Sequence, residues 1–462
     1  MFKLATARVV WGQALRGNRS FQPRWFGYTL CNVGVTWGSL PLNLLLLYYL
    51  TQIAGIPAGL AGLVIALPKI WDALVDPMFG GWIDQWSMRI GSRAPAVAIA
   101  TLVFAATLAA IFALPAGLSV YQVATIAVLL LILSSVAQTA IGVSQFAIAT
   151  EMTKGAGELS GLLSLAAITA QILSVAGSVA LPLLVANLGG GARGYSLMAL
   201  VMAGVVALAL FGFIISTRAI PVRRITDDAE TGSIWRSLRR TIGNRSFYNY
   251  LGLVVCVNGS VVIMLGFLPF ANQYVLRGDA GTLALLEGTL GITVVLGMAL
   301  APFLLRRIAA VTAMLASNIA TLIAMVLLLL ASYGPIAATY VALAVVGLGS
   351  GVIGVLIQTS ILGAAQRKLA DGTVVALGFY LGIMVASIKL GSSAGAFVSG
   401  QLLHLFGFVG GAATQSPQAM TGLRLGYTIA PSMFVMVGTI FLYRNWRSER
   451  VGGVHAADNA AE

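Results

Sequence analysis

The chain alternates between long apolar runs and short polar connections. Twelve of the runs reach the ~20 residues that an α-helix needs to cross a bilayer. They lie at 27–51, 59–83, 95–115, 120–150, 160–187, 195–217, 247–274, 281–304, 309–332, 335–364, 374–407 and 425–443. This hydropathy pattern predicts an all-α polytopic membrane protein with 12 transmembrane helices.

A polar segment at 218–246 separates six of these runs from the other six. We therefore predict an N-terminal half at 1–217, which includes a basic leader, and a second half at 247–444. The polar segment itself becomes a central loop, in which residues 233–242 have the spacing of an amphipathic helix. A polar tail at 445–462 follows, and its composition predicts disorder from Val451 onward.

The distribution of basic residues predicts the orientation in the membrane. Of the 27 Lys and Arg residues, 22 fall in the leader, the tail and the loops on one side, whereas only Arg193, Arg277 and Arg424 fall in the opposite loops. Lys and Arg are enriched in cytoplasmic loops, so both termini are predicted to be cytoplasmic, in a bacterial inner membrane. Despite the net charge of +13, no basic stripe with interleaved aromatic residues occurs, which argues against nucleic-acid binding.

The remaining composition excludes several functional classes. Cys31 and Cys256 both lie within apolar runs, so neither a disulfide framework nor a metal site is predicted. The sequence contains no P-loop or HExxH motif, and its one GxSxG match, at 391–395, lies inside the apolar run at 374–407, which argues against an enzyme and against ATP-driven transport. No cofactor is expected, and an ion gradient is the predicted energy source.

One pair of carboxylates lies deep inside an apolar run. Asp72 and Asp76 are four residues apart and share one face of a helix, which Lys69 joins. If Asp84 marks the membrane surface, Asp72 lies roughly 18 Å deeper. A carboxylate at that depth costs at least ~2.5 kcal/mol and is a functional candidate. The structural alternative is an ion pair in which Lys69 neutralises Asp72.

Three further polar or aromatic residues inside apolar runs have two interpretations each. Lys389 must face the bundle interior or a watery cavity, as a coupling residue or as a structural counter-ion. Trp71 could stack on a substrate or serve as an interfacial anchor. For Glu287, near the start of its run, an interfacial position is favoured over a functional one.

The stretch at 69–95 carries a specific motif. Its pattern, Lys-Ile-Trp-Asp-Ala-x-x-Asp-Pro-x-x-Gly-x-x-x-Asp followed by Arg, Gly and Pro, resembles the glycoside–pentoside–hexuronide:cation symporters, the melibiose permease type, within the major facilitator superfamily. The matching residues are Lys69, Ile70, Trp71, Asp72, Ala73, Asp76, Pro77, Gly80, Asp84, Arg89, Gly91 and Pro95.

The resemblance implies a major facilitator fold of two six-helix halves and a set of residue roles. Asp72, Asp76 and Thr139 correspond to the family's cation site, where Na+ is one possible occupant and H+ the other. Lys389 corresponds to a lysine near both cation and sugar. Lys69 and Trp71 are assigned to the substrate or coupling region, and Asp84, Arg89 and Gly91 to a loop that moves during transport.

The departures from the family pattern affect the sugar half of the site. Thr36 and Gly142 stand where the family has carboxylates, Phe146 stands in place of a tryptophan, and no arginine occurs near Ala167. The cation half is therefore predicted to be retained and the sugar-chelating half largely lost. A less polar pocket of Thr36, Gly142 and Phe146 would suit a less polar substrate.

Three functions follow from these observations. The first is H+- or Na+-coupled symport of a small solute, a sugar or glycoside by resemblance. The second is symport of an amphipathic substrate such as a lysophospholipid, because a lipid-transporting branch of the family shares the helix-two acids and the helix-eleven lysine. The third is a non-transporting assembly or sensing protein on the same scaffold. The expected partners are the substrate and membrane lipid, and the expected state is a monomer.

Overall fold

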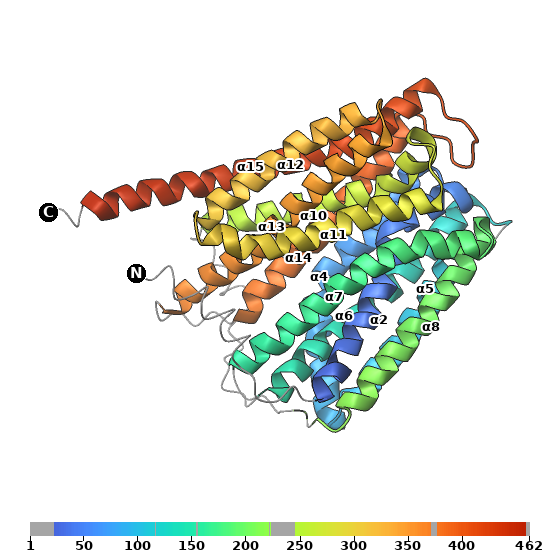
Figure 1. Cartoon of the computed structure of the whole chain (residues 1–462). Coiled ribbons are helices and arrows are strands. Elements are labelled where there is room, and N and C mark those ends of the chain that lie inside the picture. The colour runs from blue at the N-terminus through green and yellow to red at the C-terminus, as the bar shows by residue number, and fades with distance from the viewer. Residues whose placement is uncertain are drawn as a thin grey trace. The chain divides into compact units, whose positions relative to one another are not determined.

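The computed structural model describes residues 23–115, 117–153, 156–220, 222, 245–370 and 377–458. Within these ranges all regular structure is helical (Figure 1). The elements are α2 (Pro23–Leu44), α3 (Leu46–Tyr48), the π-helix η2 (Tyr49–Ile53), α4 (Ala58–Ile90), α5 (Ala94–Ile111), α6 (Val120–Met152), α7 (Ala156–Asn187), α8 (Gly191–Thr217), α10 (Arg245–Phe270), the π-helix η3 (Ala271–Val275), α11 (Ala280–Leu305), α12 (Ala310–Ala331), α13 (Ile336–Ala370), α14 (Leu377–Leu405) and α15 (Pro417–Asp458).

Each predicted apolar run coincides with one of the long helices, or with a long helix and the short turns that extend it. Ten described helices are long and apolar enough to cross a membrane, and the bent pair formed by α2 with α3 and η2 makes an eleventh. The bend of 43° lies beside a π-helical turn, a usual cause of kinks. α4 is not among these helices, and it carries Lys69, Asp72 and Asp76.

The chain divides into two compact units. Unit 1 comprises residues 1–226, 278–288 and 407–415, and unit 2 comprises residues 227–277, 289–406 and 416–462. The change at 226/227 falls within the predicted central loop at 218–246. Most of that loop, including the helix predicted at 233–242, lies outside the described residues, as does the leader at 1–22.

The predicted disorder of the tail from Val451 is wrong as far as Asp458, where α15 ends. The segment after the last apolar run contains no proline, so nothing in it removes a helical hydrogen bond. α15 therefore extends well past the predicted end of the run at residue 443.

Small residues allow close helix packing in unit 2. α14 packs against α10 where Gly391 and Gly395, four residues apart, face the backbone of Val255 and Gly259. A Cβ added at Gly391 would lie 2.3 Å from the Val255 carbonyl oxygen, so only glycine fits there. This spacing is the small-xxx-small pattern of tightly packed membrane helices.

In unit 1, α4 and α5 both pack against α6, and α2 packs against α7 and α8. The contact between α4 and α6 is the one that matters for the site, because α4 carries the acid pair and α6 carries Thr139. α6 begins with a capping box, in which the Ser119 side chain accepts from the Gln122 N–H. Its start is thus fixed about 20 residues before Thr139, roughly 30 Å along the axis.

Candidate functional site

Thr139 stands between the two predicted carboxylates. Its Oγ1 donates to Asp76 Oδ1 at 2.5 Å and lies 3.4 Å from Asp72 Oδ1. Both aspartates are half-buried. The structure thus brings together the three residues assigned to the cation site, across the α4–α6 contact.

A threonine hydroxyl has one proton and two lone pairs. At the observed distances that proton lies with Asp76. The lone pairs of the hydroxyl can accept from a proton at the pair, or can coordinate a cation held by the three oxygens. Two carboxylates that contact one hydroxyl repel each other when both are charged. Oxygen ligands of this kind suit a hard cation.

Lys69 does not form the ion pair with Asp72 that was the structural alternative for this pair of carboxylates. Its Nζ donates to Asn43 Oδ1 on α2 at 3.3 Å. Within the residues that the structure describes, it forms no ion pair with Asp72. The amide of Asn43 in turn donates to the Ser39 carbonyl oxygen at 3.0 Å. The neutralised-pair interpretation is therefore wrong, and the role of Lys69 in substrate binding or coupling stays a prediction.

Two of the positions that depart from the family pattern are exposed in unit 1, and the third is half-buried. Phe146 is 46% exposed. Gly142 is exposed, and a Cβ added there would meet no atom within 4 Å. Thr36 on α2 is half-buried. Trp71, which matches the family pattern, is 51% exposed. Gly142 therefore faces open space, and an exposed phenylalanine lies one turn further along α6.

Neutral polar side chains on α2 and α6 form two hydrogen-bonded pairs. The Ser39 hydroxyl donates to Gln138 Oε1 at 2.8 Å, and Gln145 Nε2 donates to Asn32 Oδ1 at 2.8 Å. The sequence offered only the presence of amides within apolar runs, for which helix packing was the commoner explanation. Their pairing across helices could not be read from their spacing.

The remaining predicted residues are less informative. Lys389 is half-buried on α14 in unit 2, so its link to the acid pair stays a prediction. The Asp84 side chain lies outside what the structure describes, and Arg89 is exposed. Gly91 ends α4 in the left-handed conformation with φ +74, and its N–H donates to the Ser87 carbonyl oxygen at 2.9 Å. Glu287 is 2% exposed, so it is buried among protein side chains, and its expected interfacial position stays a prediction.

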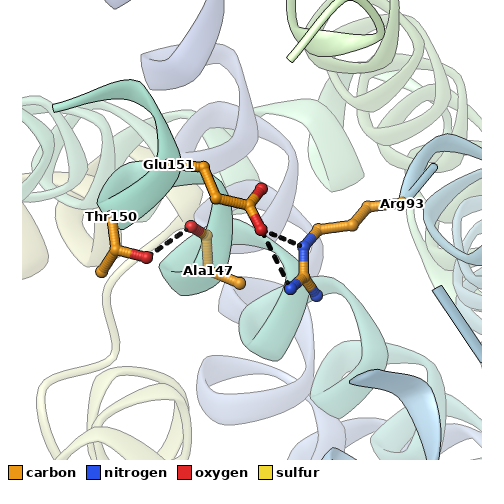
Figure 2. Close-up of polar contacts among 4 residues, drawn as sticks. All are labelled: Arg93, Ala147, Thr150 and Glu151. Atoms are coloured by element: carbon orange, nitrogen blue, oxygen red, sulfur yellow. Dashed lines mark hydrogen bonds and ion pairs between the residues drawn. The ribbon is translucent and has the colours of Figure 1, made fainter. Parts of the chain in front are cut away.

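A buried ion pair follows this helix end, and the sequence did not reveal it. Arg93, just before α5, donates from Nε and Nη2 to Glu151 Oε1 near the end of α6, at 3.3 and 3.2 Å (Figure 2). The two side chains are only 7% and 5% exposed. Glu151 Oε2 has no partner and lines a cavity of about 10 Å³, beside Thr217 and Arg218. A cavity of this size holds about one water molecule.

No group of three or more His, Cys, Asp or Glu side chains suited to a metal occurs among the described residues.

The chain is similar in sequence to known transport proteins. A family model described as MFS/sugar transport protein matches residues 27–446. The isoprimeverose transporter of Lactiplantibacillus pentosus is 23% identical over 414 residues, which cover 88% of this chain and 85% of that protein. An uncharacterized symporter of Synechocystis sp. is 50% identical over 50 residues, so the match spans only 9% of that symporter and 11% of this chain.

The fold recurs among solved structures. A bacterial homologue of the human lysosomal transporter Spinster has a TM-score of 0.69 at 13% identity, over 93% of this chain and 98% of that one. At this identity the likeness concerns the fold alone. It confirms the predicted fold class, an all-α major facilitator fold.

Proposed function

Because the chain belongs to the MFS/sugar transport protein family, which is the glycoside–pentoside–hexuronide type that the motif at 69–95 resembles, we propose that it is a cation-coupled symporter of a small solute. The family makes it a multi-pass membrane transporter of major facilitator type. The proposal adds the coupling ion, H+ or Na+, and the class of substrate.

The observation that carries the coupling proposal is the position of Thr139 between Asp72 and Asp76. A cation or a proton at these oxygens relieves the repulsion between two carboxylates inside the membrane. If the filled site favours substrate binding, the substrate favours cation binding by the same factor. Alternating access around the site then moves both species together.

Neutral sugar hydroxyls are the substrate chemistry that the surroundings support best. The amides of Gln138, Gln145 and Asn32, with the hydroxyl of Ser39, can donate and accept hydrogen bonds without fixed charge. Lys69 adds one cation beside them. The relative named an isoprimeverose transporter supports the same class. We therefore propose a glycoside or sugar as the transported solute.

An amphipathic substrate is the second candidate, and the open surface beside Gly142 favours it. Phe146 and Trp71 are about half exposed on α6 and α4, and Ile168 on α7 is 52% exposed. These apolar side chains could contact an acyl chain while Lys69 contacts a phosphate. A lysophospholipid has both groups.

Cation binding can be tested before the substrate is known. The purified full chain is titrated with NaCl in lightly buffered detergent solution, and thermal unfolding and proton release are recorded. We expect saturable stabilisation in the wild type, with proton release if Na+ displaces a shared proton. Asp72→Asn and Asp76→Asn should abolish both signals. Asp279→Asn, which alters an exposed loop carboxylate, is the matched control and should preserve them.

The substrate class is then tested with glycosides and lysolipids added at saturating cation. Stabilisation by a glycoside that requires Asp72 and Asp76 supports the first candidate, and the same result with a lysolipid supports the second. Stabilisation by cations that persists in both aspartate variants would contradict the assignment of the coupling site. No response beyond ionic strength would favour the non-transporting alternative.

A further inference from the structure

A second polar cluster lies in unit 2, away from the acid pair. α12 and α15 pack side by side, and the end of α12 meets the first turns of α15 (Figure 1). Tyr333 follows α12, and Arg424 lies seven residues into α15, with Tyr427 one turn further on. Arg424 is one of the three basic residues that break the charge rule used to predict orientation.

The Arg424 guanidinium is oriented by an aromatic ring. Its Cζ lies 4.2 Å from the centroid of Tyr333, close enough for a cation–π interaction. Its Nε is buried without a hydrogen-bond partner, and the residue as a whole is half-buried. In the part of the chain that the structure describes, no carboxylate pairs with Arg424. The ring therefore contacts a cation that no carboxylate compensates.

Tyr427 adds a second unused donor. Its side chain is 1% exposed, and its hydroxyl is buried without a partner. That hydroxyl lies near Ser332 and near the guanidinium of Arg424. Ser332 already donates to the Leu329 carbonyl oxygen at 2.6 Å. The cluster thus contains hydroxyl groups and a positive charge, and no carboxylate among the described residues balances that charge.

The surface next to the cluster is apolar. On α12, Ile323, Leu327 and Leu330 are 57%, 50% and 63% exposed, and they share one face at helical spacing. Tyr333, 68% exposed, follows at the end of this stripe. A molecule with an anionic head and an acyl chain could contact the guanidinium and the stripe at once, whereas a free anion would use only the first.

We propose that Arg424, Tyr333 and Tyr427 form a binding site for the phosphate group of a membrane phospholipid. A guanidinium presents parallel N–H donors that match phosphate oxygens, and the phosphate supplies the missing negative charge. Tyr333 follows the end of α12, and aromatic side chains at the ends of membrane helices are enriched at the level of the headgroups. The acyl chain lies along the exposed stripe of α12. This site is independent of the transport proposal.

The test uses the purified full chain and thermal unfolding in detergent. The probes are phosphatidylglycerol, diacylglycerol with the same acyl chains, and inorganic phosphate. We expect phosphatidylglycerol to stabilise the wild type more than diacylglycerol does. In Arg424→Gln the half-saturating phosphatidylglycerol concentration should rise at least tenfold. Arg193→Gln is the matched control, because Arg193 is an exposed arginine at the start of α8, on the same predicted side of the membrane as Arg424.

Two further variants protect the test against misfolding. Arg424→Lys keeps the charge but loses the planar fork, and Tyr427→Phe keeps the ring but loses the donor, so both should weaken phosphatidylglycerol binding in a folded protein. A loss of stabilisation by inorganic phosphate in the same variants would support phosphate recognition with a free anion as the ligand. Equal effects of phosphatidylglycerol and diacylglycerol, or binding unchanged in Arg424→Gln and Arg424→Lys, would overturn the proposal.

Discussion

The buried pair of Arg93 and Glu151 provides the most direct test of how unit 1 is held together. Glu151→Gln removes the negative charge with almost no change in side-chain shape. The Arg93 guanidinium then stays buried, and at position 151 a neutral amide oxygen replaces the carboxylate that accepted from it. We expect this change to destabilise the folded protein strongly, because a buried cation loses a charged partner where water has little access.

The size of the expected destabilisation follows from the distance and the hydrogen bonds between Arg93 and Glu151. At 3.2 Å the attraction between two unit charges is about 5 kcal/mol with an effective dielectric constant near 20. Breaking a buried pair by removing one partner costs ~3–5 kcal/mol. Both donors of Arg93 share Oε1, and Oε2 has no protein partner, so the pair is less complete than a two-oxygen fork. We therefore expect the lower end of the range, about 3 kcal/mol.

The assay is equilibrium unfolding in mixed micelles of sodium dodecyl sulfate and a mild detergent, which gives the free energy of unfolding. Glu151→Gln, Glu151→Met and Arg93→Met are measured singly, and Arg93→Met with Glu151→Met as a double variant. We expect the double variant to be less destabilised than the sum of the singles, because apolar residues can replace a buried pair at little cost. Arg89→Gln is the control and should change stability by less than about 0.5 kcal/mol, because Arg89 is exposed.

The reasoning fails if Glu151→Gln changes the free energy of unfolding by less than about 1 kcal/mol. It also fails if the single effects add, because additivity means that the two side chains do not interact.

Three further changes test other parts of the structure. Thr139→Val should raise the cation concentration for half-maximal thermal stabilisation roughly tenfold or more, since a donor to a carboxylate is lost; Thr139→Ser should restore it, and equal affinities would contradict the site. Gly351→Ala places a Cβ 2.1 Å from the Val294 carbonyl oxygen, so unfolding in mixed micelles should show a loss of ~1–3 kcal/mol, whereas Gly354→Ala, with nothing within 4 Å, should show none. The backbone N–H and the hydroxyl of Thr282, in the first turn of α11, lower the pKa of Asp279 from its usual 3.8. The contribution of this carboxylate to stability is therefore complete above pH 3.8 and is lost as the pH falls through the lowered pKa. Hydrogen exchange of the first turn of α11 should rise under acid and, at neutral pH, in Asp279→Ala.

The sequence determined the elements of this protein because their causes are local. A run of ~20 apolar residues forms a helix in a membrane whatever surrounds it, since its backbone must satisfy itself. The same geometry placed Asp72 and Asp76 on one face, because residues four apart are neighbours on any α-helix. The motif at 69–95 then indicated the family, which the match over residues 27–446 confirms.

The partners of these side chains were decided by tertiary structure. Thr139 lies 67 residues from Asp72, and Arg93 lies 58 residues from Glu151. Lys69 could reach Asp72 on its own helix but hydrogen-bonds Asn43 on another. Contacts between helices depend on the rotation and axial shift of each one, and these are set by side-chain packing over the whole interface. Spacing along the chain fixes which residues share a face, but only packing fixes what that face meets.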